Sequence, residues 1–214
     1  MSNPLTAAEK IIPVSQREAR RDAVWMGELV EESVPELLRS YRRAGGLNNR
    51  AAHNMPSKGA VGQICEDLLQ ILFPGFHDRA AVQDGSVDEL TVTRLAGVIS
   101  QLTDQVRKSV RIGDPHKPTG RTPPIIRKFC QALPEVRDLL RTDIEAAFDG
   151  DPATLHREEV ILSFPFIEAI AIQRLAHRLY LYGAPIVPRM MTEWAHSPTA
   201  LTFIPGPALA RIFS

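Results

Sequence analysis

The sequence predicts an all-α fold of about seven or eight helices that is followed by a short non-helical tail. Apolar residues recur at intervals of three and four along most of the 214 residues, and segments rich in Pro and Gly separate these stretches. No segment before residue 199 shows the alternation of apolar and polar residues that is typical of a strand. The length suits one large domain or two small ones.

The N-terminal half contains three predicted helices. The first covers residues 17–43, with Pro35 inside it at the cost of one backbone hydrogen bond. A connector rich in Gly and Asn follows, and the second helix begins after Ser57 and ends at Phe73-Pro74-Gly75. The third covers residues 86–112.

The segment 113–124 (GDPHKPTGRTPP) contains four prolines and two glycines, and we predict a loop or hinge there. A short helix over 125–133 comes next, and Pro134, which suits the first turn of a helix, is predicted to open another that runs to Phe148. The turn 149–152 is predicted to end that helix and to cap its successor.

The last predicted helices cover residues 163–182, closed by Gly183, and 184–196. From Thr199 to Ser214 the sequence changes character, with short apolar pairs around Pro-Gly-Pro, and this segment is predicted to be non-helical.

Composition excludes several classes of protein. The 25 basic and 25 acidic residues balance, so nothing in the overall charge favours binding to nucleic acid or to an anionic membrane. No apolar run approaches the roughly 20 residues of a membrane span or forms a signal peptide.

Cys65 and Cys130 are far apart, which fits a reducing compartment, with the cytoplasm as the expected location. The six histidines show no metal-binding spacing, so no metal is expected.

Two local features could carry chemistry. Arg174 and His177 lie three residues apart on one helix face among apolar neighbours, which predicts that both turn toward an interior or an interface. Hydrogen-bonded structural groups are the more common explanation of such a pair. Asp151 stands at a predicted helix start, where a carboxylate is usually a cap, although the same position can hold a substrate ammonium group.

The C-terminal motifs resemble a known family. The run TDIEAAFDGDPAT (142–154) and the block EEVILSFPFIEAIAIQRLAHRLYLYGAPIVPRMMTEWAHSPT (158–199) resemble the end of the helical domain of bacterial serine O-acetyltransferases. The block LLQILFPGF (68–76), LPEVRDLL (133–140) and the long first helix resemble the branch with a long N-terminus. Asp143, Arg174, His177 and His196 belong to this motif region.

The resemblance implies an activity, the transfer of an acetyl group from acetyl-CoA to L-serine in cysteine biosynthesis. It implies that the helical domain, residues 1–198, assembles into homo-oligomers. It also assigns Asp151, in the turn that contains the sequence DPA, to binding of the serine amino group.

The sequence departs from the family after Ser197. The family continues as TGIDIHPGA into a left-handed β-helix, whereas this chain reads TALTFIPGP, so residues 199–214 are expected to be a degenerate, truncated first coil. A single coil cannot form a solenoid. The catalytic base, its partner and the acetyl-CoA site of the family lie on the β-helix, so no catalytic residue and no cofactor are assigned to this chain. We expect a truncated, frameshifted or divergent family member that is inactive alone; the alternative is a non-enzymatic oligomerisation module.

Overall fold

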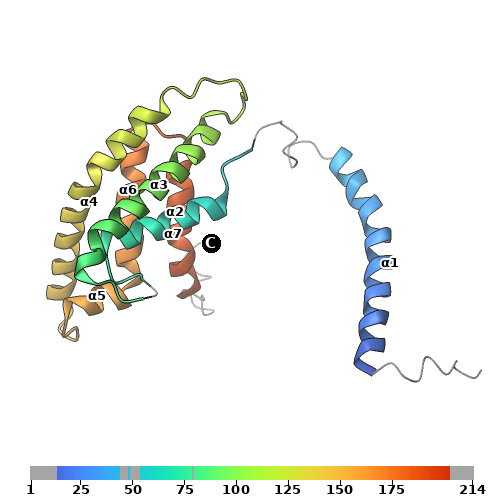
Figure 1. Ribbon diagram of the computed structural model, residues 1–214, viewed down its shortest axis with the longest axis horizontal. Coiled ribbons are helices and arrows are strands. Elements are labelled where there is room, and N and C mark those ends of the chain that lie inside the picture. The colour runs from blue at the N-terminus through green and yellow to red at the C-terminus, as the bar shows by residue number, and fades with distance from the viewer. Residues whose placement is uncertain (1–13, 44–47, 49–53, 79, 203–214) are drawn as a thin grey trace, which may run out of the picture. The chain divides into compact units, whose positions relative to one another are not determined.

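The computed structural model describes residues 14–43, 48, 54–78 and 80–202 (Figure 1). The chain divides into two compact units, residues 1–51 and residues 52–214. The first unit contains α1 (Val14–Arg43), a helix of 30 residues with Pro35 inside it.

The second unit is built of six α-helices and one 3₁₀ turn in the part of the chain that the structure describes. They are α2 (Lys58–Leu72), η2 (Asp84–Ser86), α3 (Val87–Val110), α4 (Thr122–Gly150), α5 (Arg157–Ser163), α6 (Pro165–Leu181) and α7 (Val187–Thr202). The described residues contain no strand, so the all-α prediction is confirmed, with α1 as the seventh helix.

Helix α6 lies at the centre of the second unit (Figure 1). It packs against α7 and α4 over most of its length, and α2 and α5 also contact it. One stripe of its side chains has no solvent exposure at all, because every neighbour covers the same face: Ile167, Ala171, Ile172, Leu175 and Leu179. Burying these apolar side chains is the main driving force for assembling the unit.

Helix α2 begins and ends as its sequence predicts. The Ser57 hydroxyl accepts a hydrogen bond from the Ala60 amide at 3.4 Å, which caps the first turn. The Ser57 amide donates to the Gln105 side chain of α3 at 2.8 Å, so this cap also ties two helices together. After the last turn Gly75 adopts a φ of +86°, a conformation that favours glycine.

Helix α4 corrects the prediction of a break at Pro134. One continuous helix runs from Thr122 to Gly150, where the sequence suggested two. Pro134 is exposed while Leu133 and Val136 beside it are buried, so the apolar stripe continues past the missing hydrogen bond and its packing outweighs that loss. The helix also begins two residues before the end of the predicted 113–124 loop, because prolines fit a first turn.

Other boundaries also differ from prediction. Helix α5 has seven residues and begins at Arg157, five residues after the turn 149–152 that was predicted to cap it. Helix α7 begins at Val187 and not at 184. It continues to Thr202, so the first four residues of the supposed non-helical tail are helical, as the helix formers Ala200 and Leu201 favour. The rest of that tail, 203–214, lies outside the described residues.

No single helix in the described ranges is long and apolar enough to cross a membrane. Helices α5 and α6 together reach the length and apolar composition of a membrane span, but they are bent by 78° at the break between them.

We predict that Gly62→Ala destabilises the protein. A Cβ at Gly62 would lie 2.9 Å from the Trp194 indole nitrogen, so the ring must shift. Overpacking costs about 1–3 kcal/mol, and better helix propensity returns up to about 1 kcal/mol, which leaves a net loss of up to about 2 kcal/mol in urea unfolding.

Gly97→Ala is the matched control, since nothing lies within 4 Å of a Cβ built there. This change should leave stability equal or raise it by about 0.4–1 kcal/mol. Equal effects of the two substitutions would contradict the packing of Trp194 on α2.

Candidate functional site

Asp151 lies at the C-terminal end of α4, in the turn that leads to α5. Its backbone is extended, and its amide donates to the Phe148 carbonyl at 3.4 Å. Its carboxylate accepts hydrogen bonds from the Ala153 amide at 3.0 Å and from the Thr154 hydroxyl at 3.1 Å. The turn therefore holds the half-buried carboxylate in one orientation.

Asp151 does not cap the next helix, which corrects that prediction. Helix α5 starts six residues later at Arg157, with His156 in the cap position and no side-chain capping bond. Six residues, 151–156, separate α4 from α5, and the Asp151 carboxylate stabilises this connection and not the helix after it.

A clamp joins the two ends of this turn. The Arg157 Nε lies 2.8 Å from both carboxylate oxygens of Glu145, so α5 is tied back to the last turns of α4. The guanidinium also lies 4.8 Å from the ring centroid of Phe148. The hydrogen bond and the charge of Glu145 raise the pKa of Arg157 above its usual value. Sequence spacing missed this pair, because 12 residues and a turn lie between its members.

Asp143 and Arg174 form the main polar link between α4 and α6. Two parallel hydrogen bonds join them, from Nε to Oδ2 at 2.8 Å and from Nη2 to Oδ1 at 2.7 Å. Both side chains are partly buried, at 20% and 33% exposure. Arg174 is therefore turned partly inward, and its partner is Asp143, an acidic residue of the same motif region.

His177 and His196 lie elsewhere. His177 is exposed, and its ring stacks on Tyr180 with 6.5 Å between centroids, so it does not turn toward the interior of the second unit; that it faces an interface stays a prediction. At about 100° of rotation per residue, His177 lies on the face of α6 opposite the buried stripe. His196 is exposed near the end of α7.

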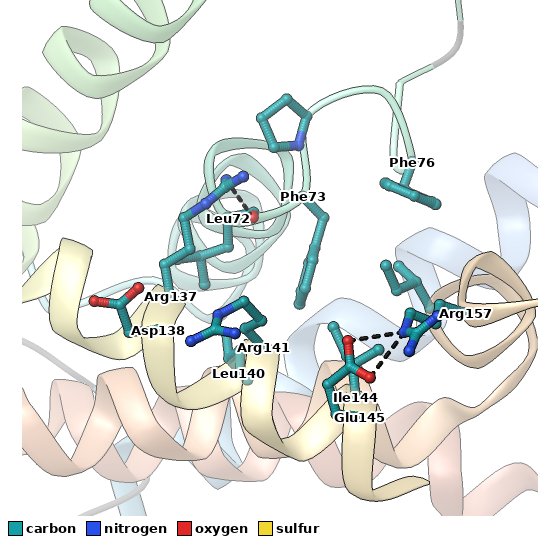
Figure 2. A pocket seen from close by; sticks show the side chains of 12 residues that line it. Leu72, Phe73, Phe76, Arg137, Asp138, Leu140, Arg141, Ile144, Glu145 and Arg157 are labelled. Carbon is teal, nitrogen blue, oxygen red and sulfur yellow. Dashed lines mark hydrogen bonds and ion pairs between the residues drawn. The ribbon is translucent and has the colours of Figure 1, made fainter. Parts of the chain in front are cut away.

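A hollow of about 290 Å³ opens between the end of α2, α4 and α5 (Figure 2). We call it the arginine-rimmed hollow. Arg137, Arg141 and Arg157 contribute guanidinium groups, Asp138 and Glu145 contribute carboxylates, and the apolar lining is Leu72, Phe73, Pro74, Phe76, Leu140, Ile144 and Ile161. Glu145 and Arg157, which clamp the Asp151 turn, form one side of it (Figure 2).

His77 is a further residue whose environment the sequence did not predict. Its Nδ1 lies 3.8 Å from Glu168 of α6, and its Nε2 is buried without a hydrogen-bond partner. These residues line a separate hollow with Gln70 and Trp194, and no residue of the Asp151 turn belongs to it. No sequence motif signals a pair that is 91 residues apart.

Neither metal nor thiol chemistry is evident in the described part of the chain. No group of three His, Cys, Asp or Glu side chains there could hold a metal ion. Both cysteines are free, and burial raises the pKa of the Cys65 thiol to about 12, which leaves it protonated at neutral pH.

Solved structures share this helical fold. Serine acetyltransferase isoform 3 from Entamoeba histolytica, in complex with cysteine, superposes with a TM-score of 0.54 at 24% identity, over 81% of this chain and 57% of that one. Native serine acetyltransferase 1 from the same organism gives 0.53 at 23% identity, over 71% and 52%. The second unit therefore has the fold of a helical domain found in acyltransferases.

Proteins that are similar to this chain in sequence are serine acetyltransferases. The plasmid serine acetyltransferase of Synechococcus elongatus is 31% identical over 168 residues, which cover 74% of this chain and 53% of that protein. The serine acetyltransferase of Mycobacterium tuberculosis is 37% identical over 75 residues, or 35% of this chain and 33% of that protein. No family model matches. The chain belongs to the serine acetyltransferase family, and it spans about half the length of the first of these relatives.

We predict that Asp143→Asn destabilises the second unit by about 1–2 kcal/mol, because it removes the charge from a partly buried, two-bond ion pair. Chemical unfolding followed by circular dichroism measures this. Glu135→Gln is the control, since Glu135 pairs with Arg178 across the same two helices but is 61% exposed. That change should cost under about 1 kcal/mol. A larger loss for the control would contradict the assignment.

Proposed function

We propose that this chain supplies the helical part of an enzyme that transfers an acetyl group from acetyl-CoA to L-serine, in the cytoplasm. The observation that carries the proposal is the relationship to the plasmid serine acetyltransferase over 168 residues. In this reaction the serine oxygen forms a bond to the acetyl carbon, the bond from that carbon to sulfur breaks, and the hydroxyl proton passes to the leaving thiolate. The products are O-acetyl-L-serine and CoA.

In this proposal Asp151 binds the serine amino group. A carboxylate accepts hydrogen bonds from an ammonium group, and Asp151 is held in place by Ala153 and Thr154 without a cationic side chain on it among the described residues. Each carboxylate oxygen accepts one bond within the turn and has a further lone pair available. Asp151 can therefore orient serine while other groups carry out the transfer.

We also propose that the 214-residue chain is inactive alone. Acetyl transfer needs a base that takes the hydroxyl proton and donors that stabilise the tetrahedral oxyanion. The partners of the Asp151 carboxylate are an amide and a hydroxyl, and neither of them can serve as that base. Asp151 is thus proposed as a binding residue and not as the catalytic base.

We predict that a coupled assay of CoA release detects no turnover by this chain, whereas a chimera with the remaining half of the plasmid relative is active. In the chimera Asp151→Asn should raise the KM for serine at least about tenfold, as expected for a lost charged hydrogen bond, and leave the KM for acetyl-CoA unchanged.

Asp149→Asn, two residues earlier and exposed, is the matched control and should change neither KM. Turnover by the chain alone would overturn the proposed inactivity. An equal effect of both substitutions, or an effect on acetyl-CoA alone, would overturn the role of Asp151.

A second candidate function, a non-enzymatic oligomerisation module, is favoured by α1. Its apolar side chains at helical spacing are all exposed, at 58% for Val30, 41% for Val34, 51% for Leu37 and 47% for Tyr41. An apolar stripe of this length on a 30-residue helix marks a surface for association. We propose that the stripe packs against the same stripe of another copy.

We predict that light scattering shows an oligomer, and that the double change Val34→Glu with Leu37→Glu lowers the mass to that of a monomer, since it places charges in the apolar contact. Glu28→Lys with Glu32→Lys, on the charged face, is the control and should keep the oligomer. A wild-type monomer, or dissociation by the control alone, would contradict the self-association of α1.

A further inference from the structure

The arginine-rimmed hollow has the composition of a ligand site that is separate from the Asp151 carboxylate. Its floor is apolar and comes from three elements, with Leu72 and Phe73 from the end of α2, Ile144 from α4 and Ile161 from α5. Ligand pockets in proteins are typically apolar hollows of roughly 300–1,000 Å³ with a few polar groups that fix orientation. At about 290 Å³ this hollow suits a small ligand.

The charges at the rim favour an anion. Three guanidinium groups face two carboxylates, which leaves an excess of one positive charge. Glu145 is fully engaged by Arg157, and Arg137 donates one bond to the Leu72 carbonyl at 2.7 Å. Arg141 has no carboxylate partner among the described residues, and its guanidinium lies at the edge of the hollow beside Arg137 (Figure 2).

Asp138, the second carboxylate at the rim, does not reverse the preference of the hollow for an anion. Asp138 is exposed and has no cationic partner in the described part of the chain. A cationic ligand that reached it would still meet the guanidinium groups of Arg137 and Arg141 on the neighbouring turns of α4. A planar guanidinium matches a carboxylate through two parallel hydrogen bonds, so Arg141 is the residue best suited to hold an anionic head group.

We propose that the arginine-rimmed hollow binds a small carboxylate with an apolar tail. The tail occupies the space between Phe73, Ile144 and Ile161, and the carboxylate lies on Arg141. The proposal does not depend on acetyl transfer, because neither Asp151 nor its two hydrogen-bond partners line the hollow.

The test uses the whole 214-residue chain and octanoate as the probe. Isothermal titration gives the affinity, and amide chemical-shift changes in a ¹⁵N-labelled sample locate the site. We expect octanoate to bind and to shift residues of the hollow, while acetate, which lacks the tail, and octylammonium, which has the opposite charge, bind at least tenfold more weakly. Arg141→Gln should weaken octanoate binding at least fivefold.

Arg127→Gln is the matched control, because Arg127 is an exposed arginine of the same helix that does not line the hollow. It should change the affinity less than twofold. If Arg141→Gln disturbs the fold, the comparison of octanoate with neutral 1-octanol decides the matter in the unaltered chain. Equal binding of 1-octanol, an equal effect of Arg127→Gln, shifts confined to other surfaces, or no octanoate binding would each overturn the proposal.

Discussion

The burial of one face of α6 is the constraint on which the rest of the second unit depends. Helices α2, α4, α5 and α7 all contact α6, and each of them hides part of its own apolar stripe there. Ile172 and Leu175 are fully buried, and each contributes roughly 1.5–3 kcal/mol relative to exposure. Ala171 on the same face is also fully buried. Helix α6 contacts four of the other five α-helices of this unit, and α3 packs on α2, α4 and α7 instead.

Polar pairs then determine the register of helices that apolar packing alone would let slide. The Asp143–Arg174 pair joins α4 to α6 with two bonds of defined direction. Asp143 is eight residues before Asp151, so the pair anchors the C-terminal part of α4, the helix that leads into the turn. Glu145 and Arg157 close the turn from the other side. The two ion pairs therefore connect the helices on either side of the turn, whereas the Asp151 carboxylate bonds only to residues of its own turn.

Sequence periodicity predicted the helices well wherever local and tertiary preferences agree. The cap at Ser57 and the left-handed glycine at 75 are examples. It failed where packing outweighs a local signal, as at Pro134, which stays inside α4 because the buried stripe on both sides continues. It also could not find the arginine-rimmed hollow, because Arg137 meets the carbonyl of Leu72 across 65 residues. Such pairs depend on how helices cross, which spacing along one helix does not encode.

The charge of Asp151 supports the proposal that this turn binds an amino group. A carboxylate beside a guanidinium is already neutralised and gains little from a second cation. Arg157 is the basic side chain that begins the helix after the turn, and Glu145 engages it through both oxygens. Arg157 thus pairs with Glu145, while the Asp151 carboxylate is oriented by the uncharged Ala153 amide and Thr154 hydroxyl. The negative charge thus stays available and preorganised, and an ammonium group that binds it incurs little cost of reorganisation.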